Sequence, residues 1–416
     1  MPVKRVWPWL NRWGLYAGAG AIGIFILGAN VYYGLTAGDG LIMANKRLIA
    51  GDFMAFWSAG RMTLEGAIEQ VHAARPIYEE QLRHAPGLDV VYLWHHPPTF
   101  LLIATGLAFL PYLAAAGLFF ALTALLYGLA TRAITPAPAA LFFAAMAPAS
   151  AMHFGNVQTG LLTAALAGFA LLSIDRRPLV SGALVGLFAI KPHLAVLYPL
   201  AFAAGGRWRA FIAATAVTLG FVGLTLWAFG WEAWRAFFDN MAHAQSMVTE
   251  QKIAPGTYAT VFANLRGLGA PVWAAGAAHG ASALLAAAVV AWMWRRGGGP
   301  YAGAALAAAS TLMSPYLFFY DLTLLLVAGA LIARQAGGWS ALTPWEQAAL
   351  AYGWLAPGLL FSVGHYEPLP FAALAAWGLV IVAVRRTLRP AESAQADPAP
   401  APPPSGSLHK PPPYRH

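Results

Sequence analysis

The chain has 416 residues, of which 59% are hydrophobic and only 10% are charged, and its mean hydropathy is +0.59. A soluble domain carries about 25% charged residues. The composition therefore excludes a soluble enzyme, a disordered protein and a fibrous protein, and it predicts a membrane protein with several spans. A net charge of +9 in such a protein is typical of basic cytoplasmic loops, not of nucleic-acid binding. No cysteine is present, which excludes disulfides and Cys-based metal sites.

The first apolar run, 15–35, follows Lys4, Arg5 and Arg12 and is long enough to cross the bilayer. It predicts an uncleaved first span, because the apolar part of a secretory signal is shorter. Later apolar runs predict further spans, for about twelve in all. They lie at 112–131, 136–152, 157–174, 178–190, 193–204, 208–230, 271–294, 300–318, 320–333, 344–362 and 368–384.

Arginine occurs in nearly every alternate short loop, which predicts that these loops and both termini are cytoplasmic. The loop arginines include Arg132, Arg176, Arg207, Arg295, Arg334 and Arg385. Two long loops, about 36–98 and 230–270, then lie outside. We expect residues 1–388 to form one integral membrane domain of the plasma (inner) membrane. Residues 389–416, rich in Pro, Ala and Ser, are expected to form a disordered cytoplasmic tail.

The first outer loop contains a helical pattern that begins directly after Asp52. The apolar positions at one-turn spacing are Phe53, Phe56, Trp57 and Gly60. This pattern predicts an amphipathic helix resting on the membrane surface, with the Arg61 cation off the apolar face. A second helix is expected after Pro76.

Asp52 has two interpretations on local sequence. It can cap the helix by accepting backbone N–H bonds, or it can act as a catalytic base that takes a proton from a hydroxyl group. The adjacent His95 and His96 are a weak metal signal, because no spacing identifies other ligands. They can donate hydrogen bonds to an anionic headgroup, or they can be an interfacial pair without a specific role.

Several short motifs, in this order and spacing, resemble those of glycosyltransferase family 87. The first loop contributes Asp52-Phe53, Trp57, Arg61, Gly66, Tyr78 and Pro97-Pro98. The later motifs are Gly155-Asn156-Val157-Gln158, Ile190-Lys191-Pro192 with Leu194, Gly206-Arg207-Trp208-Arg209, and Ser314-Pro315-Tyr316 with Tyr320-Asp321. The resemblance covers about residues 15–335.

The resemblance implies an all-α polytopic GT-C-type fold and a donor that carries a hexose, typically mannose, on polyprenyl phosphate. It implies an inverting transfer on the outer face to a glycolipid or glycan acceptor, with membrane lipids as surroundings. The family's first-loop Asp is matched by Asp52, which would be the general base.

Lys191 is the candidate contact for the leaving phosphate, where negative charge develops. The spans beside it are too short to cross the bilayer, so the Lys191-Pro192 turn is expected below the outer surface. A Lys at that depth needs an anionic partner, which is either the phosphate or a carboxylate such as Asp321. Asp321 can also bind sugar hydroxyls or cap a helix. Gln158 is either a sugar contact or part of a polar turn.

No Walker motif, paired DxD carboxylates or nucleotide-binding glycine motif occurs in the sequence, which argues against a nucleotide-sugar donor. No cofactor is predicted, and the sequence leaves a divalent metal undecided. The competing classes are a transporter or flippase of lipid-linked sugar and a polysaccharide ligase or polymerase. Spans nearly free of charge and the absence of an internal repeat disfavour the transporter.

Overall fold

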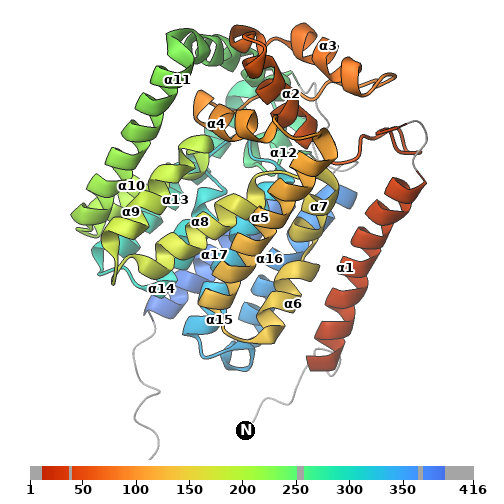
Figure 1. Ribbon diagram of the computed structural model, residues 1–416. Helices are drawn as coiled ribbons and strands as arrows, with labels where there is room; N and C mark the ends of the chain where they lie inside the picture. Colours follow the sequence, from red (N-terminus) through yellow and green to blue (C-terminus); the bar gives the residue numbers. More distant parts are fainter. Residues whose placement is uncertain (1–11, 37–39, 251–256, 364–368, 389–416) are drawn as a thin grey trace, which may run out of the picture.

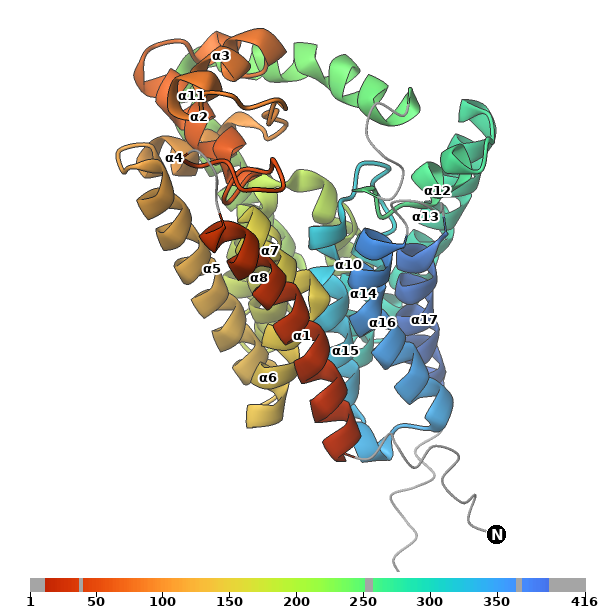
Figure 2. The ribbon, with the colours of Figure 1, turned by 90° about the vertical axis from the view of Figure 1, so that its right-hand side faces the viewer.

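The computed structural model describes residues 12–36, 40–250, 257–363 and 369–388. All regular elements among these residues are helices, apart from two isolated β-bridges at Ile42–Leu48 and Tyr258–Phe318. Figure 1 shows most helices side by side in a bundle, with α2 (Phe53–Leu64) and α3 (Ala74–His84) at one end. The described ends of the chain, at Arg12 and Leu388, lie toward the opposite end (Figures 1 and 2). The predicted all-α class is confirmed.

Five helices of the described residues are long and apolar enough to cross a membrane. They are α1 (Arg12–Leu35), α5 (Tyr112–Ile134), α11 (Trp208–Thr249), α13 (Val272–Arg295) and α17 (Phe371–Leu388). Each coincides with a predicted span. The predicted total of about twelve is not confirmed, because most of the other predicted spans form shorter or interrupted helices.

The other helices of the bundle lie between these five in the chain. They are α4 (Pro98–Leu107), α6 (Pro138–Met146), α7 (Pro148–Asn156), α8 (Gly160–Ser173), α9 (Pro178–Gly186), α10 (Leu197–Ala204), α14 (Pro300–Ser310), α15 (Thr323–Gln335) and α16 (Pro344–Ser362). The predicted span 136–152 is split at Ala147, whose ψ of 137° is extended. Pro148 follows it and disfavours the helical conformation there. The predicted span 300–318 ends as a helix already at Ser310.

Helix α2 is enclosed by protein, not laid on the membrane surface, so this prediction is wrong. Every side chain from Phe53 to Gly60 is buried. Gly60 allows the close approach of α4, because a Cβ at this position would overlap the carbonyl group of Ala104. The first outer loop therefore has a core of its own, built from α2, α4 and the end of α5.

The second predicted outer loop, 230–270, is largely helical. Helix α11 bends at Gly230, whose φ of 73° and ψ of 177° are not helical, and its outer half continues to Thr249 across the end of the bundle (Figure 2). The short helix α12 (Val261–Gly267) follows. The predicted tail 389–416 and the basic residues Lys4 and Arg5 lie outside the described residues.

Candidate functional site

Four distant segments meet in one network of polar side chains. The Gln158 Nε2 group donates to Asp52 Oδ2 at 3.4 Å, and Gln158 Oε1 accepts from the Thr159 amide at 3.2 Å. Lys191 Nζ donates to Thr159 Oγ1 at 3.4 Å and to Asp321 Oδ1 at 2.6 Å. Asp52, Gln158, Lys191 and Asp321, all predicted as site residues, are thus brought together, with Thr159 as the link.

Lys191 stands at a break between two short 3₁₀ helices, η3 (Leu187–Ile190) and η4 (Pro192–Leu194). Its φ of −152° is extended because Pro192 follows. The side chain is only 6% exposed. Of the two anionic partners predicted for Lys191, a phosphate or a carboxylate, the carboxylate is present. Lys191 and Asp321 form a buried ion pair. Each ion offsets the cost of burying the other.

Side chains of the first loop hold the backbone that precedes Lys191. Thr99 Oγ1 donates to the Ala189 carbonyl at 2.7 Å, and His96 Nδ1 lies 3.3 Å from the Ile190 carbonyl. These contacts satisfy carbonyl groups that a broken helix leaves without partners. Burial and the charge of Lys191 lower the pKa of His96 well below its usual value, so the ring is neutral at pH 7.

Asp321 lies in the 3₁₀ helix η6 (Phe319–Leu322) and is completely buried. It does not cap a helix, because α15 begins after Leu322. One carboxylate oxygen contacts Lys191, whereas Oδ2 has no hydrogen-bond partner among the described residues. The pair therefore keeps one free acceptor inside the site.

Asp52 occupies the position before α2 but makes no capping hydrogen bond, so the cap interpretation is wrong. The backbone just before it is strained, because Ala50 adopts a φ of +55°. The Tyr112 hydroxyl donates to the carbonyls of Ile49 and Ala50, at 2.8 Å each, and helps to hold this conformation. Strain of this kind persists where the surroundings determine the geometry, often at functional sites.

The charge state of Asp52 reflects opposing influences. Burial raises the pKa of the carboxyl and outweighs the Gln158 hydrogen bond and the charges of Lys191 and Arg47, which lower it. The resulting pKa is about 6, above the usual 3.8. The group is half-buried. At neutral pH it is mostly ionised, with a pKa near that of an efficient general base.

Gln158 is aimed by an unusual backbone. Val157 ends α7 with a φ of +51°, which is rare for a β-branched residue. The neighbouring Asn156, grouped with Gln158 in the sequence motif, donates instead to the Met152 carbonyl within its own helix at 3.0 Å. The turn thus directs Gln158, but not Asn156, into the network.

The other predicted site residues lie outside the network. Arg61 pairs with Glu65 at 2.9 Å along α2 and lies over the Trp57 ring. His95 is exposed, whereas the His96 ring packs against Phe56, Trp94 and Phe100. No group of three or more His, Asp or Glu side chains could hold a metal ion within the residues described.

Sequence reasoning missed the aromatic wall of the site. The Tyr320 ring centroid lies 4.9 Å from Lys191 Nζ, and its ring contacts those of Phe319 and Phe318. Tyr320 belongs to the Tyr320-Asp321 motif but was not among the predicted site residues. A run of Phe and Tyr before Asp321 was the available signal, but aromatic runs are equally common in cores.

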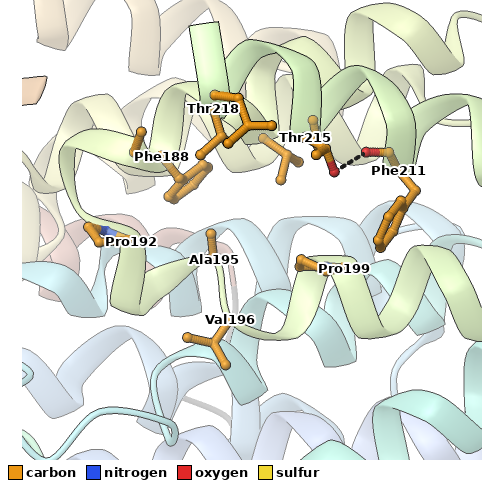
Figure 3. Close-up of a pocket in the computed structure, with 12 residues that line it drawn as sticks. Phe188, Pro192, Ala195, Val196, Pro199, Phe211, Thr215 and Thr218 are labelled. Atoms are coloured by element: carbon orange, nitrogen blue, oxygen red, sulfur yellow. Dashed lines mark hydrogen bonds between the residues drawn. The ribbon is translucent and has the colours of Figure 1, made fainter. Parts of the chain in front are cut away.

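An apolar groove of about 300 Å³ runs beside the Lys191 break, between α9, η3, η4 and α10 on one side and α11 on the other (Figure 3). Phe188, Ala189 and Pro192, which flank Lys191 in the chain, line it. Its hydroxyl groups are turned to backbone: Thr215 donates to Phe211, at 3.1 Å, and Thr218 to Gly186, at 3.4 Å. The groove therefore offers a hydrocarbon-like surface.

The fold and this network define a membrane-embedded protein with an enzyme-like polar site beside a hydrophobic groove. Residues 94–315, more than half of the chain, match the model of glycosyltransferase family 87, and the chain belongs to this family. It is a membrane glycosyltransferase. No curated protein and no solved structure gives a significant match. The matched range contains Gln158 and Lys191, and Asp52 and Asp321 lie on either side of it.

Proposed function

We propose that the protein transfers a hexose, with mannose favoured by the family resemblance, from polyprenyl phosphate to a glycolipid or glycan acceptor. The observation that carries this proposal is the network between Asp52 and Lys191. It connects a carboxylate with a raised pKa to a buried cation beside an apolar groove. No metal or other cofactor is assigned a part in it.

In the proposed reaction, Asp52 removes the proton of an acceptor hydroxyl, whose oxygen attacks the anomeric carbon of the donor sugar. The new bond joins this oxygen to the anomeric carbon, and the bond from that carbon to the phosphate oxygen breaks. Polyprenyl phosphate leaves as an anion and the configuration inverts. Lys191 stabilises the negative charge on the leaving phosphate.

The groove supports a donor carried on a lipid. A hydrocarbon chain in the groove would bring its phosphate toward the Lys191 break, because groove residues flank Lys191 on both sides. Asp321, Gln158, His95 and His96 are proposed to contact the sugar or the phosphate, with Asp321 supplying its unpartnered Oδ2 atom as an acceptor. Arg61 is not included, because it pairs with Glu65 along α2 and has no contact with the network.

We place this chemistry on the extracytoplasmic side of the plasma (inner) membrane, with both termini cytoplasmic. The arginines of the predicted inner loops support this orientation. Helix α17, whose last turn carries Arg385 and Arg386, ends toward the end of the bundle opposite to α2 and α3 (Figures 1 and 2).

The test is transfer from radiolabelled polyprenyl-phosphate-mannose to membrane lipids by the purified full-length protein. We expect labelled product from this donor and none from a nucleotide-linked mannose of equal specific activity. Transfer from the nucleotide sugar alone would overturn the proposed donor class.

A further inference from the structure

Arg47 is a cation of the first loop that takes no part in the proposed transfer reaction. It lies in a tight turn of the first loop, closed by a bond from the Met43 amide to the Arg47 carbonyl at 2.8 Å and by one from the Ile49 amide to the Leu41 carbonyl at 3.0 Å. Lys46 takes a φ of +62° in this turn. The side chain of Arg47 is nevertheless exposed. A defined backbone thus presents a free guanidinium group.

Arg47 differs from the other arginines of this loop. Arg61, Arg75 and Arg83 each pair with a glutamate, at 2.9, 2.8 and 2.8 Å. Among the residues that the structure describes, no carboxylate pairs with Arg47; its Cζ atom lies instead 5.8 Å from the Phe361 ring centroid. An exposed guanidinium over an aromatic face keeps its hydrogen-bond donors available for a planar anion.

A row of aromatic rings connects Arg47 with Lys191. Phe361 lies 5.3 Å from Phe319, and Phe319 lies 5.1 Å from Tyr320, as measured between ring centroids. Lys191 Nζ faces Tyr320 at the other end of the row. The charges of both cations act on Asp52 and lower the pKa of its carboxyl. Asp52 is thus within electrostatic reach of two cations, of which Lys191 is already neutralised by Asp321.

The turn contacts the end of an apolar helix that is long enough to span a membrane. Tyr112, the first residue of α5, bonds the backbone just after the turn, and Phe361 is next to the last residue of α16. Helix α5 is one of the apolar helices long enough to span a membrane. The ends of such helices lie at the headgroup region.

We propose that Arg47 forms a second anion site, which binds the phosphate of a lipid substrate beside Asp52. Guanidinium groups bind phosphate oxygens in pairs, which fixes the orientation of the headgroup as well as its charge. The phosphate comes either from the prenyl-phosphate donor or from an acceptor that is itself a phospholipid. The position of the site rests on the proposed function of Asp52, but its anion binding can be measured without transfer.

The experiment measures binding of three probes to the full-length protein in detergent: farnesyl phosphate, dihexanoyl phosphatidylinositol and, as the phosphate-free control, farnesol. Arg47→Gln is expected to weaken binding of at least one phosphate probe by roughly tenfold to a hundredfold, the usual size for a charged hydrogen-bonded contact. Arg47→Lys should retain part of the affinity. Farnesol binding should not change. Arg75→Gln, which removes a charge from the same loop, should bind all probes like the wild type.

The two phosphate probes separate the sources. A loss confined to farnesyl phosphate assigns the site to the donor, and a loss confined to the phosphoinositide assigns it to the acceptor. Unchanged binding of both phosphate probes by Arg47→Gln would overturn the proposal. So would an equal loss for farnesol, or wild-type binding that is no tighter for the phosphate probes than for farnesol. A failed transfer assay with intact phosphate binding would instead count against the proposed function alone.

Discussion

The pKa of the Asp52 carboxyl is about 6, because burial raises it more than the Gln158 hydrogen bond and the nearby cations lower it. A general base acts when it is ionised, so kcat/KM should rise with pH and level off above about pH 6. Gln158→Ala removes a bond to the charged form and should move this acid limb to higher pH. Asn156→Ala, whose side chain bonds only its own helix, should leave the limb in place. A limb that moves to lower pH in Gln158→Ala would contradict this account.

The buried Lys191–Asp321 ion pair is expected to affect the stability of the folded protein. Removing one member leaves the other charge buried without compensation, which costs about 3–5 kcal/mol. We expect Lys191→Met and Asp321→Leu each to lower the thermal unfolding temperature in detergent strongly, and the double variant to lose much less than their sum. Arg75→Met breaks an exposed pair and should cause no measurable change. Additive losses in the double variant would show that the two charges do not compensate each other.

At the scale of elements, the contact between α2 and α4 depends on Gly60. A Cβ there meets Ala104 backbone atoms and the Ala108 Cβ, so Gly60→Ala should destabilise the protein by about 1–3 kcal/mol. Gly106→Ala in α4 is the matched control, because nothing lies within 4 Å of its Cβ. It should be neutral or stabilising by up to about 1 kcal/mol. Thermal unfolding of both variants in detergent measures the difference, and equal behaviour would show that this contact is not close.

The elements also show how far local patterns can be trusted. The helix after Asp52 and the break at Lys191 were both predicted, the first from apolar spacing and the second from two short apolar runs beside a proline. The burial of every residue from Phe53 to Gly60 was not predicted. Apolar spacing identifies one face of the helix, but it does not show that other parts of the chain cover Ser58 and Ala59. Pro148 was the signal for the break in the predicted span 136–152. Hydropathy alone does not show this break, because the residues on both sides of it are apolar.

At the scale of the whole molecule, the order of the motifs and their resemblance to a family predicted Asp52, Gln158, Lys191 and Asp321 as site residues. The fold brings all four together. Arg61 and His95 were also predicted as site residues, Arg61 as part of a motif, but the network does not include them. Thr159 and Arg47 carried no local signal, because their importance arises from contacts between segments far apart in the chain. His96 was predicted to donate a hydrogen bond to a lipid headgroup. In the structure its Nδ1 atom lies next to the Ile190 carbonyl, a partner 94 positions away in the chain that no local pattern could indicate.

The orientation of the whole chain can be tested directly, because it contains no cysteine. Asn45→Cys lies in the first loop and Arg176→Cys in the turn between α8 and α9, and both positions are exposed. In intact cells, a membrane-impermeant maleimide should label Asn45→Cys, and it should label Arg176→Cys only after the membrane is opened. The reverse pattern would place the proposed active site in the cytoplasm.

The central claim is that Asp52 is the base of a sugar transfer, and the most direct measurement compares transfer rates of the wild type and Asp52→Asn with the same lipid-linked donor. The substitution keeps the shape of the side chain but removes its basicity. The account predicts a loss of at least roughly a hundredfold, with an unchanged unfolding temperature, and no loss in Asp89→Asn, an exposed Asp of the same loop. An Asp52→Asn protein that transfers sugar at the wild-type rate would contradict it.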